Sequence, residues 1–207
     1  MRVQQAYAAW ATTYDSDRNL TRDLDRQISQ SLLQNLRVDS VLEIGCGTGK
    51  NTALLASIAT KVQAIDFSEE MLVKAREKSQ FQNVTFTLAD INHPWPCEDR
   101  SADLITFNLV LEHVPGLSFV FAEAARVLIN GGRVFVSELH PFRQYQGAQA
   151  QFTLNDKAIQ IPAFVHHISD FLDAAAANRF ALSQMNEWWH EEDKGKPPRL
   201  ITFIFRK

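Results

Sequence analysis

The sequence predicts an α/β fold, in which a mostly parallel sheet is covered by helices on both faces. Two observations predict it. Short apolar runs alternate with amphipathic helical patterns between residues 38 and 139, which is the rhythm of parallel β-α-β units. Two late apolar runs, 180–189 and 200–206, are joined by a loop with no helical pattern between them. These runs predict an antiparallel final pair of strands.

Two helices are expected before the first strand. Residues 4–14 place Tyr7, Trp10 and Tyr14 on one face, where their rings are expected to cover the edge of the core. Leucine or isoleucine recurs at every fourth residue from Leu20 to Leu36. This period predicts an amphipathic helix over 20–37.

From residue 38 to residue 139, strands and helices are expected in turn. Ser68 is the predicted N-cap of one helix, with acidic residues in its first turn. Gly131-Gly132 is expected to end another helix. The expected elements are strand 38–45, helix 50–59, strand 61–66, helix 68–79, strand 83–89, strand 102–108, helix 117–129 and strand 133–139.

Residues 140–168 interrupt this alternation. The strand-like runs 151–154 and 157–161 flank Asn155-Asp156, which predicts a β-hairpin. A helix over 169–178 follows and leads to the final pair of strands. The insert therefore lies between the parallel strands and the C-terminal strand pair.

Composition narrows the class of protein. The 207 residues are most simply one domain. The formal net charge is −3, so no nucleic-acid or anionic-membrane partner is expected. Two cysteines do not make a disulfide framework and are typical of a reducing cytosol. No signal-peptide core and no apolar run of ~20 residues is found, so a cytoplasmic protein is expected.

The stretch Val41-Leu42-Glu43-Ile44-Gly45-Cys46-Gly47-Thr48-Gly49-Lys50 joins a strand to a helix through three glycines. A dinucleotide fingerprint needs a third glycine where Lys50 stands. A phosphate-binding P-loop needs a glycine where Ile44 stands. The remaining pattern is acidic-x-G-x-G-x-G, and its acid favours a ligand that carries positive charge.

This motif resembles the first motif of the class I S-adenosylmethionine (SAM)-dependent methyltransferases, and the resemblance covers residues 38–207 apart from the insert. It implies a Rossmann-like three-layer sandwich with a seven-stranded sheet and an antiparallel last strand. It divides the chain into a helical lid (1–37), a SAM-binding core (38–139), a substrate-side insert (140–168) and a C-terminal helix with a strand pair (169–207). The enzyme groups that it is similar to include quinone-biosynthesis and malonyl-carrier-protein methyltransferases.

Acidic and polar residues stand at the ends of the predicted strands, where ligands bind in open α/β sheets. Asp66 ends the second strand about 20 residues after the turn, a spacing that suits an acid on ribose hydroxyls. By resemblance, Phe67 packs on adenine, Asp90 bonds its amino group and the Asn108 segment holds the methionine part. The expected cofactor-binding residues are Glu43, Gly45, Cys46, Gly47, Gly49, Asp66, Phe67, Asp90, Ile91, Asn108 and Leu109.

His113 and His140 follow the fourth and fifth strands, so both can face the ligand cleft. A histidine near its ordinary pKa of ~6.5 can act as a general base. The alternative is an ordinary loop histidine, and the sequence does not separate the two. The spacing of the histidines supports no metal site.

On the acceptor side, Tyr14 belongs to a Tyr-Asp segment that forms part of a lid in many small-molecule methyltransferases. Arg143 and Tyr145 belong to an insert rich in aromatic and amide side chains. Such an insert suits a partly polar organic substrate, a structural flap or a dimer contact, and these remain open. A monomer or a homodimer is expected.

Three functions are compatible with these patterns to different degrees. The leading one is transfer of a methyl group from SAM to O, N or C of a small-molecule or carrier-bound acceptor. The second is a catalytically inactive SAM-binding sensor or scaffold, because the motifs concern only the cofactor. The third, a nicotinamide dehydrogenase, is disfavoured by Lys50 in the place of the third glycine.

Overall fold

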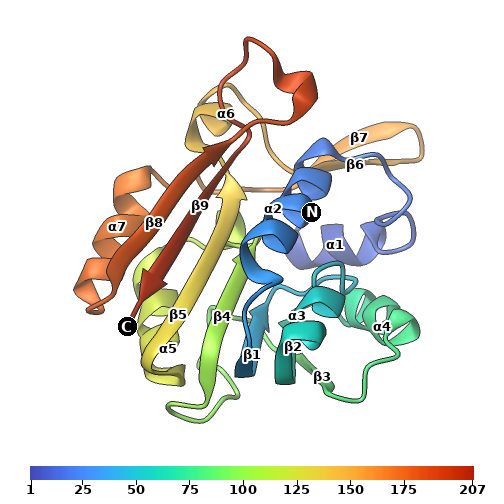
Figure 1. The fold of residues 1–207 in the computed structure, drawn as a ribbon. Helices are drawn as coiled ribbons and strands as arrows, with labels where there is room; N and C mark the ends of the chain where they lie inside the picture. The colour runs from blue at the N-terminus through green and yellow to red at the C-terminus, as the bar shows by residue number, and fades with distance from the viewer.

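The computed structural model describes residues 1–207 and contains a seven-stranded sheet in the order β3-β2-β1-β4-β5-β9-β8 (Figure 1). The first five strands pair in parallel. Strand β9 is antiparallel to both of its neighbours, β5 and β8. These pairings confirm the predicted sheet and its antiparallel last strand. The strands are β1 (Val38–Ile44), β2 (Ala59–Asp66), β3 (Val84–Leu88), β4 (Ala102–Asn108), β5 (Leu128–Leu139), β8 (Ala181–Trp188) and β9 (Leu200–Arg206).

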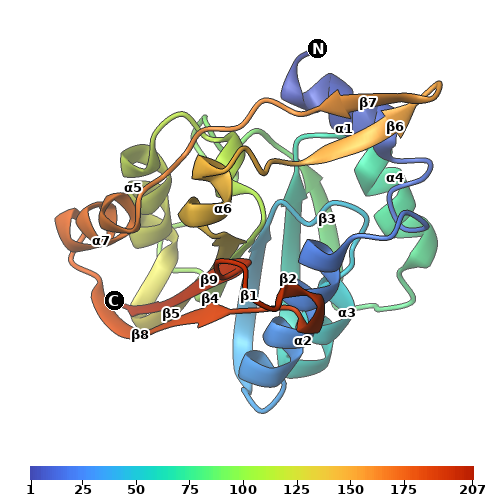
Figure 2. The ribbon, with the colours of Figure 1, turned by 90° about the horizontal axis from the view of Figure 1, so that it is seen from above.

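Helices cover both faces of this sheet. Successive side chains of a strand point to opposite faces, so Val41 packs in the cluster with α2 and α3 while Leu42 packs in the cluster with α5 and α7. Figure 2 shows the two pairs of helices on opposite sides of the strands. No helix combines the length and apolar character needed to cross a membrane. The helices are α2 (Leu20–Leu33), α3 (Thr52–Ile58), α4 (Glu69–Lys78), α5 (Leu117–Val127) and α7 (Ile168–Ala177).

The prediction that Gly131-Gly132 ends a helix is wrong. Helix α5 ends at Val127, and both glycines lie inside β5. Gly131 has a positive φ of 80°, and a Cβ on Gly132 would lie 2.7 Å from Cγ of Leu128 and 3.0 Å from the carbonyl oxygen of Asp103. The glycines therefore permit a close approach between β5 and its neighbour β4.

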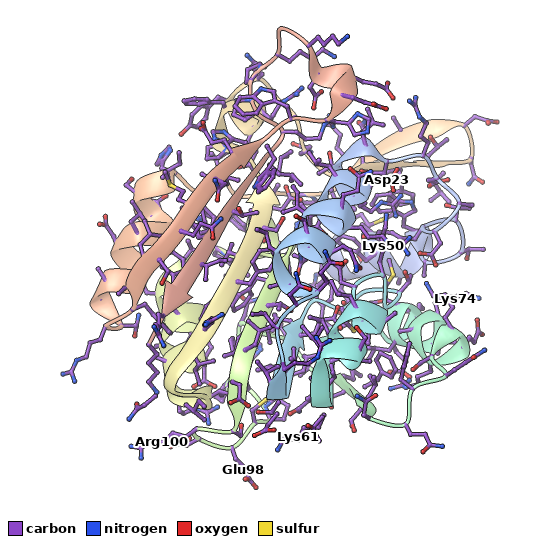
Figure 3. All side chains as sticks on the ribbon, viewed as in Figure 1. Asp23, Lys50, Lys61, Lys74, Glu98 and Arg100 are labelled. Atoms are coloured by element: carbon purple, nitrogen blue, oxygen red, sulfur yellow. The ribbon has the colours of Figure 1, made fainter.

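The two N-terminal helices are shorter than predicted. Helix α1 (Val3–Trp10) ends four residues before the expected boundary, and α2 ends at Leu33. Lys50, directly after the glycine turn, pairs with Asp23 of α2 at 2.9 Å. Figure 3 labels this pair on the face of the molecule that carries α2 and α3.

The insert contains the predicted hairpin and one helix that was not predicted. Strands β6 (Gln151–Leu154) and β7 (Lys157–Gln160) pair around Asn155 and Asp156, which both have positive φ. The hairpin lies over α1 (Figure 2), where the rings of Trp10 and Phe152 stack at 5.3 Å. The unpredicted helix α6 (Pro141–Tyr145) is short and starts with proline at its first position.

Candidate functional site

A cavity lies beyond the carboxyl ends of β1, β2 and β4. The chain leaves β1 outward to β2 and β3 and then returns to β4 on the other side of β1. This reversal is the switch point at which open α/β sheets bind ligands. The N-terminal segment adds Tyr7 and Tyr14 to the wall. The lining residues are Tyr7, Tyr14, Gly45, Gly47, Ile65, Asp66, Phe67, Met71, Ala89, Asp90, Ile91, Asn92, Asn108, Leu109, Val110, His113 and Val114.

The glycine turn forms one wall of this cavity. Gly45 and Cys46 both donate backbone hydrogen bonds to the carbonyl of Ile65, at 2.8 and 3.0 Å. Gly45 has a φ of +69°, and a Cβ there would lie 2.6 Å from Cγ2 of Val110. Gly47 has a φ of +54° and open space where a Cβ would stand. The first glycine thus packs against the loop after β4, and the second leaves the cavity free.

Asp66 ties the turn to the end of β2. Its Oδ2 accepts a hydrogen bond from the N–H of Gly47 at 2.8 Å, and its Oδ1 accepts one from the N–H of Ser68 at 2.9 Å. Burial raises the pKa of Asp66 to about 6, although these hydrogen bonds act in the opposite direction. The carboxyl group is therefore oriented by backbone N–H groups on both sides.

Two further acids are buried behind the turn. Glu43 accepts a hydrogen bond from Oγ1 of Thr52 at 2.6 Å. Asp25 of α2 accepts hydrogen bonds from the amides of Asn51 and Asn108, at 3.0 and 2.7 Å. Burial raises the pKa of Glu43 to about 8 and that of Asp25 above its ordinary value. Neither carboxyl group forms an ion pair, so burial without a counter-charge favours the protonated form of Glu43 at neutral pH.

The raised pKa of Glu43 predicts a pH-dependent stability. Its ordinary value is 4.5, so its contribution is complete below pH 4.5 and is lost as the pH rises toward 8. Burial lowers the pKa of His113 and of His140. These histidines therefore change the free energy of unfolding only below about pH 6.5, where they lower it as the pH falls. We expect the free energy of unfolding of the unliganded protein to fall by about 1–2 kcal/mol between pH 6.5 and 8 through Glu43 alone.

Urea denaturation at pH 6.5 and pH 8 measures this fall, and Glu43→Gln is the matched variant. Glutamine keeps an oxygen for Thr52 but cannot ionise, so the fall should become smaller. The same fall in both proteins would show that Glu43 does not hold a proton in the folded state.

His113 lies at the far wall of the cavity, and its two ring nitrogens have different partners. Nδ1 lies 3.0 Å from the carbonyl oxygen of Pro162, which can only accept, so Nδ1 carries the hydrogen. In the neutral ring Nε2 is then the acceptor, and the Tyr7 hydroxyl donates to it at 2.8 Å. Burial lowers the pKa of His113 and raises that of Tyr7 well above its usual range.

The structure brings ten of the predicted site residues together in this cavity: Gly45, Gly47, Asp66, Phe67, Asp90, Ile91, Asn108, Leu109, His113 and Tyr14. Three predicted cofactor residues are placed elsewhere. Glu43 lies behind the turn, and Cys46 packs with Ala64 and Leu72. Gly49 lines a separate hollow on the other side of the turn.

The remaining predicted residues lie outside this cavity. His140 is fully buried, with Nδ1 accepting from the N–H of Phe142 at the start of α6 and Nε2 at 2.9 Å from Glu187. Both of its ring nitrogens are engaged in structural contacts. Arg143 lines a second cavity, and Tyr145 is exposed on α6.

Sequence reasoning assigned Tyr7 to the edge of the core and missed its contact with His113. These residues are 106 positions apart, and no periodicity or local motif links them. The aromatic face of α1 predicts burial but does not predict the group that it covers. Asn92 and Val110 were also missed, although both lie within about three residues of the predicted strand ends at 89 and 108.

Comparison with known proteins agrees with this architecture. Residues 42–136 match the family model described as a methyltransferase domain. The chain is 35% identical over 140 residues to the biotin biosynthesis bifunctional protein BioHC of Cellvibrio japonicus, covering 68% of this chain and 28% of that protein. It is 39% identical over 107 residues to the demethylmenaquinone methyltransferase of Tropheryma whipplei, covering 51% and 44%.

The chain thus spans less than half the length of both of these curated relatives. A crystal structure of an S-adenosylmethionine dependent methyltransferase from Mesorhizobium loti superposes with a TM-score of 0.75 at 18% identity. That match covers 91% of this chain and 100% of the other chain. At this identity it shows a shared fold. The matched domain, the sheet order and the cavity at its switch point place this chain in the class I S-adenosylmethionine-dependent methyltransferase family.

Proposed function

We propose that this protein transfers a methyl group from SAM to O, N or C of a small organic or carrier-bound acceptor. The observation that carries the proposal is the charge of the cavity. Its wall contains Asp66 and Asp90 but no lysine or arginine. A phosphate-bearing cofactor would meet repulsion there, whereas the sulfonium and ammonium groups of SAM are attracted.

The residues present fit this cofactor. Asp66 has lone pairs left on both oriented carboxylate oxygens, so it can accept hydrogen bonds from the two ribose hydroxyls. Phe67 and Ile91 supply apolar surface for adenine, and Asp90 a carboxylate for its amino group. Gly45 and Gly47 let the ligand approach the backbone. Asn108, held by Asp25, lies on the side assigned to the methionine part.

Bound SAM supplies a methyl group on a positively charged sulfur, which is a good leaving group. The protein must then hold the acceptor atom in line with that methyl group and exclude water. The rings of Tyr7 and Tyr14 close the cavity from the N-terminal side. Gln4 of α1 fastens this segment by donating to the carbonyl of Phe67 at 2.5 Å.

His113 is the group that we assign to proton removal from a protonated acceptor. Its Nε2 lone pair is directed at the Tyr7 hydroxyl, which lines the same cavity. Because burial lowers the pKa of His113, the ring is neutral at physiological pH and ready to accept. Tyr7 can pass a proton from the acceptor to Nε2 through its own hydroxyl. We assign no proton transfer to His140, because both of its nitrogens are engaged.

Titration calorimetry with S-adenosylhomocysteine tests the cofactor assignment. We expect saturable binding by the unmodified protein and about a hundredfold weaker binding by Asp66→Ala, which removes charge-assisted hydrogen bonds worth ~1.5–3 kcal/mol each. Asp173→Ala is the matched control, since Asp173 is exposed on α7, away from the cavity. Circular dichroism must show that both variants are folded.

A screen of labelled SAM with carboxylates, phenols, amines and carrier-protein thioesters tests catalysis. Transfer of the label to any of them supports the enzyme. Absence of S-adenosylhomocysteine binding would refute the proposal as a whole. Binding without transfer to any acceptor class would favour the inactive sensor or scaffold.

A further inference from the structure

A second cavity, with a volume of about 320 Å³, adjoins the cofactor cavity. Tyr7, Tyr14 and Leu109 belong to both walls, so an acceptor in the second cavity lies next to the ligand in the first. Its size suits a small organic molecule. The other lining residues are Trp10, Asn19, Leu20, Thr21, Arg22, Glu112, Leu139, Arg143, Gly147, Ala148, Gln149, Ala150, Gln151 and Arg199.

The charge of the second wall is opposite to that of the first. It contains three arginines, Arg22, Arg143 and Arg199, and a single acid, Glu112. The first wall contains two aspartates and no lysine or arginine. The two cavities therefore favour ligands of opposite charge on either side of Tyr7.

Two of these arginines share one carboxylate. Arg199 binds Asp193 with two hydrogen bonds of 2.7 Å, and Nη2 of Arg143 lies 2.7 Å from Oδ1 of the same residue. Burial alone would raise the pKa of Asp193, but the hydrogen bonds from Arg199 and the adjacent guanidinium of Arg143 hold it well below its usual range. This cluster of two cations and one anion has a net charge of +1.

Arg22 adds a cation without a carboxylate partner. It is only 6% exposed and stacks on the rings of Trp10 and Tyr14, with its Cζ 5.0 and 4.0 Å from their centroids. Its Nη atoms donate to the backbone carbonyls of Tyr14 and Asp17, and its Nε has no hydrogen-bond partner. A buried guanidinium without a counter-ion is unfavourable, and a bound anion offsets that cost.

The one acid in the wall does not cancel this charge. Burial raises the pKa of Glu112 to about 7, so a large share of its carboxyl groups is protonated at neutral pH. Its contacts are weak for a charged group, with Gln144 at 3.4 Å and His113 at 3.8 Å. The wall of the second cavity remains positive.

We propose that the second cavity binds the acceptor through an oxyanion, either a carboxylate or a phosphoryl-type group, held by Arg143 and Arg199 with Arg22 behind them. The acceptor is then an acid, and its nucleophilic end lies toward Tyr7. Guanidinium groups match both oxyanions through paired N–H donors. This assignment of the acceptor class rests on the proposed methyltransferase function.

Calorimetry of the full chain saturated with S-adenosylhomocysteine tests the site. Succinate and inorganic phosphate represent the two oxyanions, and succinamide is the neutral analogue of succinate. We expect at least one oxyanion to bind and succinamide not to bind. Arg143→Gln should weaken that binding about tenfold or more, the scale of a charge-assisted hydrogen bond, and Arg143→Lys should weaken it less.

Two features make the test specific. Asp193 keeps its two hydrogen bonds from Arg199 when Arg143 is replaced, so Arg143→Gln is expected to fold. Arg206→Gln, at an exposed position on β9 with no polar side-chain contact, is the matched control and should bind as the unmodified protein does.

Equal binding of succinate and succinamide, no effect of Arg143→Gln, or no binding of either oxyanion would overturn the oxyanion site. Oxyanion binding without S-adenosylhomocysteine binding would instead defeat the proposed function.

Discussion

Replacing Gly45 with alanine is expected to lower the free energy of unfolding by about 2–5 kcal/mol. A residue with a side chain costs ~1–2 kcal/mol in the left-handed region, and Gly45 has a φ of +69°. Its new Cβ would also meet Cγ2 and Cβ of Val110 at 2.6 and 2.8 Å, and overpacking costs typically ~1–3 kcal/mol. Because Val110 lines the cofactor cavity, its displacement should also weaken S-adenosylhomocysteine binding.

Gly47→Ala is the matched control for that variant. Gly47 has a similar φ of +54°, but no atom lies within 4 Å of the place that its Cβ would occupy. The free energy of unfolding of Gly47→Ala should therefore fall only by the ~1–2 kcal/mol that the left-handed backbone costs. Urea denaturation of both variants measures the difference. Equal losses would mean that the clash with Val110 is relieved by a movement of the loop after β4, and that the cost at Gly45 is conformational alone.

Replacing His113 with glutamine is expected to reduce the rate of methyl transfer by about 10²–10⁴-fold for an acceptor that must lose a proton. Glutamine is still able to accept a hydrogen bond from Tyr7 but cannot take up its proton. S-adenosylhomocysteine binding should be nearly unchanged. In the unmodified protein, kcat/KM should fall only below the lowered pKa of His113, and this limb of the pH profile should disappear in the variant.

Tyr7→Phe separates the two steps of the proposed relay. It keeps the ring that closes the cavity and removes the hydroxyl that donates to His113 at 2.8 Å. If Tyr7 passes the proton, the fall in the rate of methyl transfer in Tyr7→Phe should approach the fall in His113→Gln. The decrease of kcat/KM at low pH should also become smaller. A His113→Gln enzyme with the same rate and the same pH profile as the unmodified protein would exclude His113 as the base.

The sheet was predictable because its signals are local. Strands β1, β2 and β4 are short apolar runs next to helical patterns, as expected for strands covered on both faces of a parallel sheet. The same locality made Asp66 and Asn108 predictable, since both stand directly at strand ends. The end of a strand can be recognised in the sequence, and the carboxyl ends of parallel strands meet at the same edge of the sheet. Residues at these ends are therefore expected to lie close together.

Contacts between distant segments were not predictable in this way. Tyr7 and His113, or Arg143 and Asp193, meet only because α1 and the insert fold back over the sheet. The position of His140 after a strand suggested the cleft, but Pro141 starts a helix there and uses the imidazole as its N-cap. A capping role and a catalytic role have the same signature when only the neighbouring residues are known.

The place of β9 has a consequence for how the protein is made. Strand β9 follows β8 in the chain but lies between β5 and β8 in the sheet. During synthesis β8 therefore leaves the ribosome without its partner, while β5 still presents an open edge. Neither strand can complete its pairing until β9 has been synthesised, and open strand edges are prone to pair with other chains. The nascent chain is therefore most exposed to aggregation just before residues 200–206 emerge.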